Sequence, residues 1–337
     1  METPYFSVVI DNYNYGSFIA QAIESVLGQD FPAGEVETIV VDDGSTDGSR
    51  EIVARFKDRA RLIAQANRGQ AGAFATGFSA ARGQVVCLLD SDDYWHPGKL
   101  SAVAKRLEDR AIGIVQHYQR DVDAAGRPLP NPLPDWPKAY DLEDFLQGRF
   151  VNAATSSLAF RRAVLERILP VPPNVFYLYD DYLLDQGLFF TNIGNIPRIL
   201  GYHRIHGANN WAQKYMNPEK LEASLREIRA LHAALEPKLK ARGLSFSPRY
   251  LALQGMERAR REILAAAHRG ERGRAFQVWS RLLACHGFSP LGFFRCATCL
   301  LALVSPRLYL RAHGLYGRWH WLAGVRRRAL PGPQDPA

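Results

Sequence analysis

The chain has 337 residues, of which 47% are hydrophobic and 23% are charged. These fractions are typical of a folded globular protein with one large or two smaller domains, and they exclude an intrinsically disordered chain. The formal net charge is +8, but the acidic clusters lie in the first half and the C-terminal tail is basic. The N-terminus enters a predicted strand at once, without the pattern of a signal peptide, so we expect a cytoplasmic protein.

Short β-branched runs alternate with segments of helical spacing over residues 1–90. We expect strands at residues 6–10, 37–41, 62–64 and 85–89, and helices at residues 18–27, 47–56 and 72–81. Strands that alternate with helices at this spacing form parallel βαβ units. The predicted fold class is therefore α/β, with a Rossmann-like, mostly parallel sheet flanked by helices.

The second half of the chain departs from this alternation. Residues 127–137 contain five prolines, which fit neither a helix interior nor a central strand, so a loop is predicted there. From about residue 219 the apolar residues recur at helical spacing. We expect an α/β domain at residues 1–215, a helical C-terminal region at residues 216–330 and a disordered tail at residues 331–337.

An acidic cluster, residues 90–93 with the sequence Asp-Ser-Asp-Asp, directly follows the apolar run at residues 85–89. Open α/β sheets bind their ligands at the carboxyl ends of their strands. Asp90 and Asp92 point to the same side if the strand conformation continues, and like charges this close repel each other unless a cation lies between them. Carboxylate oxygens suit Mg²⁺ or Mn²⁺, which in turn suit a diphosphate. The alternative is a solvated acidic turn.

Other sites for metals or nucleotides do not fit the sequence. An EF-hand that starts at Asp43 places Ala54 where a bidentate glutamate is needed. No G-x-G-x-x-G follows the first strand, and no G-x-x-x-x-G-K-[ST] occurs in the chain. The phosphates of a nucleotide must therefore be held by a metal and by side chains.

A set of motifs over about residues 5–210 resembles, in order and spacing, those of family-2 glycosyltransferases, which are inverting enzymes with the GT-A fold. The motifs are Ser7-Val8-Val9-Ile10 with Tyr13-Asn14, Val40-Val41-Asp42-Asp43-Gly44-Ser45-Thr46-Asp47, Asn67-Arg68-Gly69 and Leu89-Asp90-Ser91-Asp92-Asp93. One departure is that Asp11-Asn12 stands where the family commonly has Pro-Thr. The resemblance implies a nucleotide-sugar donor bound at the strand ends.

The resemblance also implies which residues meet the nucleoside. Tyr13 would lie against the base, which suits an aromatic face, and Asp42 would accept a hydrogen bond from the base. Asp43 would orient the loop. Arg68 would approach the diphosphate or the base, where a fixed cation is useful.

Further residues would hold the metal and the diphosphate, if the resemblance applies. Asp90, with Ser91 beside it, would contact the ribose or the metal, and Asp92 would be the main protein ligand of Mn²⁺ or Mg²⁺. The metal would stabilise negative charge on the leaving nucleoside diphosphate. In a segment that resembles the family's Tyr-Arg-x-His, Arg204 would stabilise the diphosphate, and His206 would ligate the metal or close over the nucleotide. A purely structural histidine is the alternative.

Inversion needs a base that takes a proton from the acceptor hydroxyl. The family uses a pair of acids ahead of an apolar helix, and Asp180-Asp181 match this pair. The resemblance therefore implies that Asp181 is the base and that Asp180 is its orienting neighbour. The alternative is that both acids complement the dipole at a helix N-terminus.

These residues together predict an inverting transfer of a sugar to a hydroxyl of a glycan or glycolipid, in polysaccharide biosynthesis. A nucleotide-diphosphate sugar is the expected donor, with UDP-sugar favoured and dTDP and GDP left open. A non-catalytic nucleotide-sugar-binding partner in a glycan assembly is the alternative.

The C-terminal tail interleaves arginines with large apolar residues. Its longest apolar run, residues 296–304, is too short to span a bilayer. We expect either basic amphipathic helices at an anionic membrane surface, which would make the protein peripheral at the inner face, or a helical subdomain packed on the core. Nucleic acid is not expected, because the arginines lie outside any recognised nucleic-acid motif.

Overall fold

The computed structural model describes residues 3–131, 133–172, 175, 178–206, 209, 217–286 and 290–309. The chain divides into two compact units. The first unit comprises Met1–Leu129, Pro134–Phe145 and Arg149–Ile205, and the second comprises Pro130–Leu133, Leu146–Gly148 and His206–Ala337. The expected domain boundary at residue 215 and the expected disordered tail at residues 331–337 lie outside the described residues and stay predictions.

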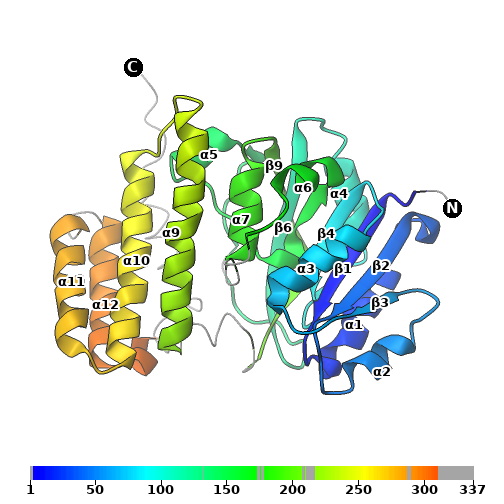
Figure 1. Ribbon diagram of the computed structural model, residues 1–337, viewed down its shortest axis with the longest axis horizontal. Coiled ribbons are helices and arrows are strands. Elements are labelled where there is room, and N and C mark those ends of the chain that lie inside the picture. Colours follow the sequence, from blue (N-terminus) through cyan, green and yellow to red (C-terminus); the bar gives the residue numbers. More distant parts are fainter. Residues whose placement is uncertain are drawn as a thin grey trace. The chain divides into compact units, whose positions relative to one another are not determined.

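One nine-stranded sheet forms the core of the first unit, in the order β3-β2-β1-β4-β8-β6-β9-β5, with β7 paired to β9. Figure 1 shows strands β1 to β4, β6 and β9 of this sheet. Its strands are β1 (Phe6–Asn12), β2 (Val36–Asp42), β3 (Arg61–Ala64), β4 (Val85–Asp90), β5 (Tyr94–Trp95), β6 (Ile112–Asp123), β7 (Ala139–Tyr140), β8 (Ala159–Arg161) and β9 (Asn192–Ile205).

The two halves of this sheet differ in strand direction. Strands β3, β2, β1 and β4 are parallel, as the sequence predicts. Strand β8 runs antiparallel to both β4 and β6, whereas β6 and β9 are parallel to each other. The α/β class is confirmed, with a parallel first half and a mixed second half.

The helices of the first unit include three that overlap the predicted helices at residues 18–27, 47–56 and 72–81. The unit's helices are α1 (Gly16–Leu27), α2 (Ser49–Ala54), α3 (Gly69–Ala80), α4 (Lys99–Arg106), α5 (Leu142–Leu146), α6 (Arg162–Ile168) and α7 (Tyr179–Gly187), with short 3₁₀ turns η1 (Ala33–Glu35) and η2 (Thr155–Ser157). Helix α3 packs very closely on β1, because a Cβ on Gly77 would lie 2.2 Å from Cγ1 of Val9. Small residues in α3 therefore allow this contact.

The proline-rich segment is a loop in the part of the chain that the structure describes. Between residues 127 and 137 the described residues form no helix and no strand, apart from a single bridge between Val122 and Pro128. Tyr118 of β6 donates a hydrogen bond from its hydroxyl to the carbonyl of Pro134, at 2.5 Å. The prediction of a loop is confirmed for these residues.

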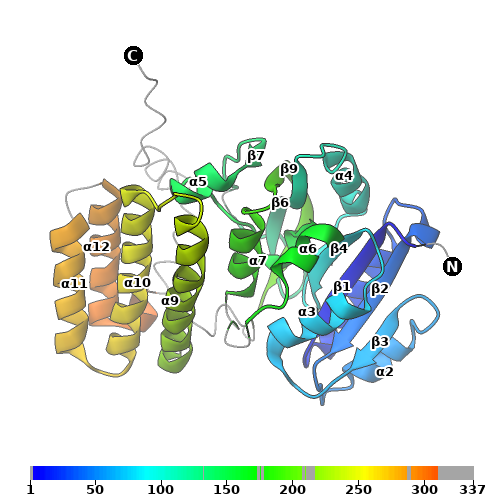
Figure 2. The same ribbon diagram turned by 45° about the horizontal axis from the view of Figure 1, so that its top comes forward.

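The second unit is helical, as predicted from about residue 219. Its helices are α9 (Pro218–Lys240), α10 (Pro248–His268), α11 (Arg272–His286) and α12 (Pro290–Val304), which form one bundle (Figure 2). Asn217 and Ser247 cap α9 and α10 through their side-chain oxygens, each before a proline at the first helical position. None of the helices in the described ranges is long and apolar enough to cross a membrane. The expected cytoplasmic location stays a prediction.

Candidate functional site

Three parallel strands end at the same edge of the sheet. Register pairs Asn12 of β1 with Asp42 of β2, and Asp11 of β1 with Asp90 of β4. The acids after β2 and β4 therefore lie on either side of the end of β1. This is the arrangement predicted from the strand ends, and it places the candidate donor residues together.

Asp42 is fully buried and fully hydrogen-bonded. Its Oδ1 accepts from Asn12 Nδ2 at 2.9 Å, and its Oδ2 accepts from the Ser45 amide at 3.1 Å and from Arg50 Nε at 2.6 Å. Burial raises the pKa of Asp42, but the hydrogen bonds from Ser45, Arg50 and Asn12 outweigh it, so the pKa is lowered. The carboxylate stays charged and holds the loop after β2.

The loops after β1 and β2 are tied together. Asn14, whose φ of 58° is left-handed, accepts a hydrogen bond from the Thr46 amide at 2.8 Å and donates from its own amide to Ser45 Oγ at 2.9 Å. Beside it, Tyr13 is 47% exposed. The fixed loop thus presents an aromatic ring to solvent, as stacking on a base would need.

Asp43 joins the loop after β2 to the start of α3. Its Oδ1 accepts from Gln65 Nε2 at 2.6 Å and from the Arg68 amide at 2.9 Å. Arg68 is the N-terminal cap residue of α3, and it is exposed. The loop-orienting role predicted for Asp43 agrees with this geometry, and Arg68 lies on the segment that Asp43 holds.

Asp90 lies in a crowd of carboxylates at the end of β4. Its Oδ1 accepts from Gln70 Nε2 at 2.8 Å. Burial, followed by the charges of Asp11, Asp93 and Asp92, raises the pKa of Asp90 well above its usual value. Burial and the charge of Asp92 likewise raise the pKa of Asp11 to about 8. This close group of carboxylates destabilises the protein when no cation or ligand is bound.

Arg204 of β9 holds the loop that carries Asp92. It is 3% exposed, and its Nε donates to the Asp92 carbonyl at 2.9 Å, its Nη1 to the Ala124 carbonyl at 2.8 Å and its Nη2 to Gln21 Oε1 at 2.5 Å. Its backbone amide donates to Asp93 Oδ1 at 2.9 Å. This geometry is that of a positioning residue. A contact between Arg204 and a diphosphate stays a prediction.

Ser156 supports the same loop from the other side. Its Oγ accepts the Asp90 amide at 3.0 Å, and its carbonyl accepts Trp95 Nε1 and Lys99 Nζ, each at 2.8 Å. Lys99 is fully buried, with Nζ 3.3 Å from the centre of the Trp95 ring. Burial lowers the pKa of Lys99 to about 7. Residues 90–93, which include the buried Ser91, are thereby held in a fixed conformation.

The acid pair predicted as the catalytic base begins α7. Asp181 accepts a hydrogen bond on Oδ1 from Asn152 Nδ2 at 2.7 Å, and its amide donates to Asp180 Oδ1 at 3.0 Å. The charge of Asp180 also contributes to the raised pKa of Asp90, so the start of α7 lies close to the end of β4. The predicted base and one of the predicted metal ligands, Asp90, therefore lie in the same region of the first unit.

The predicted metal ligands belong to two different units of the chain. Within the described ranges, no group of three or more His, Cys, Asp or Glu side chains is arranged to hold a metal ion. Asp90 and Asp92 lie in the first unit, whereas His206 opens the last segment of the second, where its amide donates to Asn209 Oδ1 at 2.5 Å. The role of His206 as a ligand stays a prediction.

Sequence reasoning did not find several residues that shape the site. Gln21, Gln70, Asn152 and Ser156 all act through contacts with residues far along the chain. No local pattern marks them, because each contact joins residues that are 20 or more positions apart and exists only in the folded unit. Asp11 did have a signal, since it replaces the residue type common in the family.

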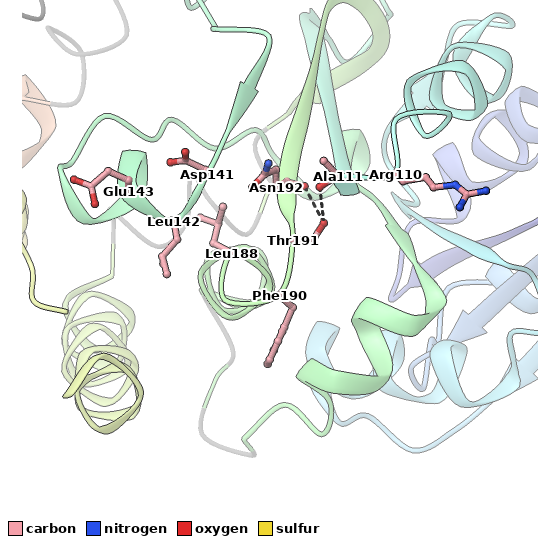
Figure 3. Close-up of a pocket in the computed structure, with 9 residues that line it drawn as sticks. All are labelled: Arg110, Ala111, Asp141, Leu142, Glu143, Leu188, Phe190, Thr191 and Asn192. Atoms are coloured by element: carbon pink, nitrogen blue, oxygen red, sulfur yellow. Dashed lines mark hydrogen bonds between the residues drawn. The ribbon is translucent and has the colours of Figure 1, made fainter. Parts of the chain in front are cut away.

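A surface pocket of the first unit lies at the opposite edge of the sheet (Figure 3). Arg110 and Ala111 precede β6, and Thr191, whose hydroxyl donates to the Ala111 carbonyl at 3.1 Å, precedes β9. These are the amino ends of strands that run in the same direction as β4. The acid cluster is at the carboxyl ends, so the pocket is separate from the candidate site.

Comparison with known proteins links this geometry to a family. Residues 7–169 match the model described as Glycosyl transferase family 2. An uncharacterized glycosyltransferase of Nostoc sp. is 37% identical over 213 residues, which cover 60% of this chain and 66% of that protein. Succinoglycan biosynthesis protein ExoO of Rhizobium meliloti is 38% identical over 130 residues, covering 38% of this chain and 37% of that protein. Each match spans less than two thirds of the relative.

Solved structures of the same fold cover nearly the whole chain. The mannosyltransferase PcManGT from Pyrobaculum calidifontis, in complex with GDP-Man and Mn²⁺, matches with a TM-score of 0.56 and 19% identity over 98% of this chain and 88% of that one. S. aureus TarS 1–349, in complex with UDP-GlcNAc, matches with a TM-score of 0.52 and 19% identity over 96% of this chain and 89% of that one. At this identity the likeness concerns the fold, and the expected GT-A type is confirmed.

Proposed function

Residues 7–169 of this chain belong to glycosyl transferase family 2, and on that premise we propose that the protein transfers a sugar from a nucleotide-diphosphate donor to a hydroxyl of a glycan or glycolipid. The transfer inverts the anomeric centre. Asp181 takes the proton of the acceptor hydroxyl, whose oxygen attacks the anomeric carbon from the face opposite the leaving diphosphate. Asp180 and Asn152 orient Asp181.

The observation that best supports this proposal is the meeting of β1, β2, β4 and α7 at one edge of the sheet. Asp42 and Asp90 flank the end of β1, and the charge of Asp180 acts on Asp90. A donor bound between these strands would have its nucleoside near Tyr13 and Asp42. Its diphosphate would lie near residues 90–93, and its sugar would face Asp181.

The residues at this edge fit a divalent cation. Asp11 Oδ1 is buried without a hydrogen-bond partner, and the charges of neighbouring carboxylates raise the pKa values of Asp11 and Asp90, so added positive charge would relieve repulsion. Asp92 and Asp90 would hold the ion, with Mn²⁺ or Mg²⁺ as the candidates. When bound, it would supply stabilisation of the negative charge on the leaving nucleoside diphosphate.

We favour a UDP-sugar as the donor and a growing glycan as the acceptor. The TarS structure contains UDP-GlcNAc and the mannosyltransferase structure contains GDP-Man, so the fold accepts either base. The name of the Rhizobium relative refers to succinoglycan biosynthesis, which supports a polysaccharide acceptor.

A donor screen tests the proposal. The full chain is incubated with UDP-, GDP- and dTDP-sugars, each with Mn²⁺, Mg²⁺ or EDTA, and released nucleoside diphosphate is measured. We expect release from a UDP-sugar that requires a divalent cation. If UDP with Mn²⁺ raises the thermal midpoint but no donor is turned over with any acceptor, the protein is a non-catalytic nucleotide-sugar-binding partner instead.

Substitution of the two central acids tests the residue roles. Asp181→Asn is expected to reduce transfer about a thousandfold, because an amide cannot accept the hydroxyl proton. Asp92→Asn is expected to weaken the metal dependence and the turnover together. Asp109→Asn, at a surface carboxylate paired with Arg106 at 3.2 Å, is the matched control and should leave turnover unchanged. Full turnover by a folded Asp92→Asn variant would contradict the metal role.

A further inference from the structure

Helix α12 has one face buried in the core of the second unit. Cys296, Cys299 and Ala302 are at most 2% exposed, and they pack with residues of α10 and α11. Trp279 of α11 donates a hydrogen bond from Nε1 to the Cys296 carbonyl at 2.9 Å. The helix is therefore firmly attached to its bundle, and its outer face has a fixed orientation within that unit.

The outer face of α12 is also apolar. Phe293 is 65% exposed, Leu300 is 43% exposed and Val304 is 72% exposed, and Leu308, just beyond the helix, is 43% exposed. We call these four residues the α12 stripe. They recur at multiples of three to four residues, and the exposed Ala297 lies between the first two, so they share one side of the helix. A water-soluble bundle gains nothing from such a row of large apolar side chains in water.

The sequence from the start of α11 to residue 334 carries charge of a single sign. Residues 272–334 contain ten arginines and no aspartate, glutamate or lysine. In the described part of this segment, Arg272, Arg281 and Arg307 are exposed. A partner that meets this face must therefore be anionic as well as apolar.

These two features select one kind of partner. A second copy of this chain would bring two arginine-rich faces together, and nucleic acid offers phosphates but no apolar phase for Phe293 and Val304. An anionic lipid surface supplies both acyl chains and phosphates, and a helix with this composition lies in the interface without crossing it. We propose that the second unit docks on an anionic membrane surface, with the α12 stripe in the acyl region and the arginines at the lipid headgroups.

Vesicle co-sedimentation of the full chain tests the docking. Wild-type protein is expected to bind vesicles of phosphatidylcholine mixed with phosphatidylglycerol, and to bind pure phosphatidylcholine vesicles weakly. The binding should fall as salt is added, since the headgroup contacts are screened. The double variant Phe293→Ser/Val304→Ser should lower the partition coefficient about tenfold or more, because two large apolar side chains no longer enter the bilayer.

Leu251→Ser on α10 is the matched control, because Leu251 is 48% exposed and lies outside the α12 stripe. It should bind anionic vesicles like wild type. The single variant Val304→Ser, at the most exposed position, replaces the double variant if that protein does not fold. Wild-type protein that ignores anionic vesicles would overturn the proposal. Variants of the α12 stripe that bind vesicles like wild type would also overturn it. The same holds if the only effect of these variants is to convert a dimer into monomers. Donor turnover measured without vesicles should be the same in all variants, so the test is independent of the proposed transfer.

Discussion

Two regions of the molecule place carboxylates in opposite surroundings. At the sheet edge, Asp11 and Asp90 lie opposite each other on neighbouring strands. Burial raises both pKa values, with the charge of Asp92 adding to the shift of Asp11 and the charges of Asp11, Asp93 and Asp92 adding to the shift of Asp90. In the second unit, Glu257 lies among Arg260, Arg261 and Arg295. Burial raises the pKa of Glu257, but the three arginines outweigh it and lower the pKa to about 2.

The difference indicates what each region is organised to do. The carboxylate of Glu257 is balanced by charges of the protein itself, so it stabilises the helical bundle without any ligand. For Asp11 and Asp90 the charges that raise the pKa are those of other carboxylates, so a bound cation would stabilise these two acids. Carboxylates that repel each other thus distinguish the candidate binding site in the first unit from Glu257 in the second unit, whose charge is balanced by arginines.

The largest effect is expected from Arg204→Lys. Lysine cannot donate to Asp92, Ala124 and Gln21 at once, so the loop with the predicted metal ligands loses its support. We expect a loss of about 4 kcal/mol in the free energy of unfolding, measured by thermal melting. The apparent affinity for Mn²⁺ in donor turnover should fall as well. A variant with wild-type Mn²⁺ affinity would contradict the positioning role.

Asp11→Asn tests the repulsion among the carboxylates at the sheet edge. In the folded protein Asp11 keeps its proton up to about pH 8, whereas the unfolded chain loses it near the usual value of 3.8. Stability of the metal-free protein therefore falls as the pH rises between these values. The asparagine variant has no proton to lose, so we expect it to be more stable than wild type by about 3 kcal/mol at pH 8 and equal to it near pH 4.

Thermal melts of both proteins in EDTA across this pH range measure the difference. Added Mn²⁺ should stabilise wild type more than the variant, because wild type has more repulsion to relieve. Parallel melting curves at every pH would show that the acids at the sheet edge do not repel one another in the folded protein.

Glu257→Gln tests the balanced cluster of Glu257 and three arginines in the second unit. The change leaves the three arginines without their shared carboxylate, and we expect a loss of about 2 kcal/mol at pH 7. Because the folded pKa is depressed to about 2, this stabilisation is present above the usual value of 4.5 and is lost as the pH falls towards 2. Wild type and variant should therefore converge in acid, which thermal melts at stepwise pH can measure.

The smallest effect is expected from Glu262→Gln on the same helix. Glu262 accepts from Arg229 at 3.4 Å, and the Arg229 side chain is 63% exposed. Such exposed pairs contribute about 0–1 kcal/mol, so the thermal midpoint should stay close to that of wild type. If Glu257→Gln and Glu262→Gln lose the same free energy of unfolding, Glu257 contributes no more than an ordinary surface ion pair.

The sequence predicted most reliably what depends on local pattern. The apolar runs at residues 6–10 and 85–89 predict strands because both faces of β1 and β4 are buried, so apolar residues dominate both runs, with Ser7 as the polar exception. The meeting of Asp42 and Asp90 followed from the rule that parallel strands end at one edge. The start of α9 at Pro218 was predicted within one residue, because the apolar residues recur at helical spacing from about residue 219.

Contacts between distant segments were not predictable in this way. Strand β8 has three residues and no pattern of its own, yet it separates β4 from β6. The hydrogen bonds of Arg204 depend on how β9 pairs with β6 through several register shifts. Lys99 gave no signal, because a lysine is rarely fully buried and only its contacts with Ser156 and Trp95 explain why this one is.

The central position of β8 in the sheet affects how the chain folds while it is synthesised on the ribosome. Because Ala159–Arg161 fill the gap between β4 and β6, a nascent chain that stops short of them exposes two unpaired strand edges in the middle of its sheet. Strands β1 to β4 can pair early, but β4 and β6 cannot join into one sheet until these residues have emerged. Chaperones would therefore be needed most while residues 90–160 are being made, and shortened expression products that end in this interval should aggregate.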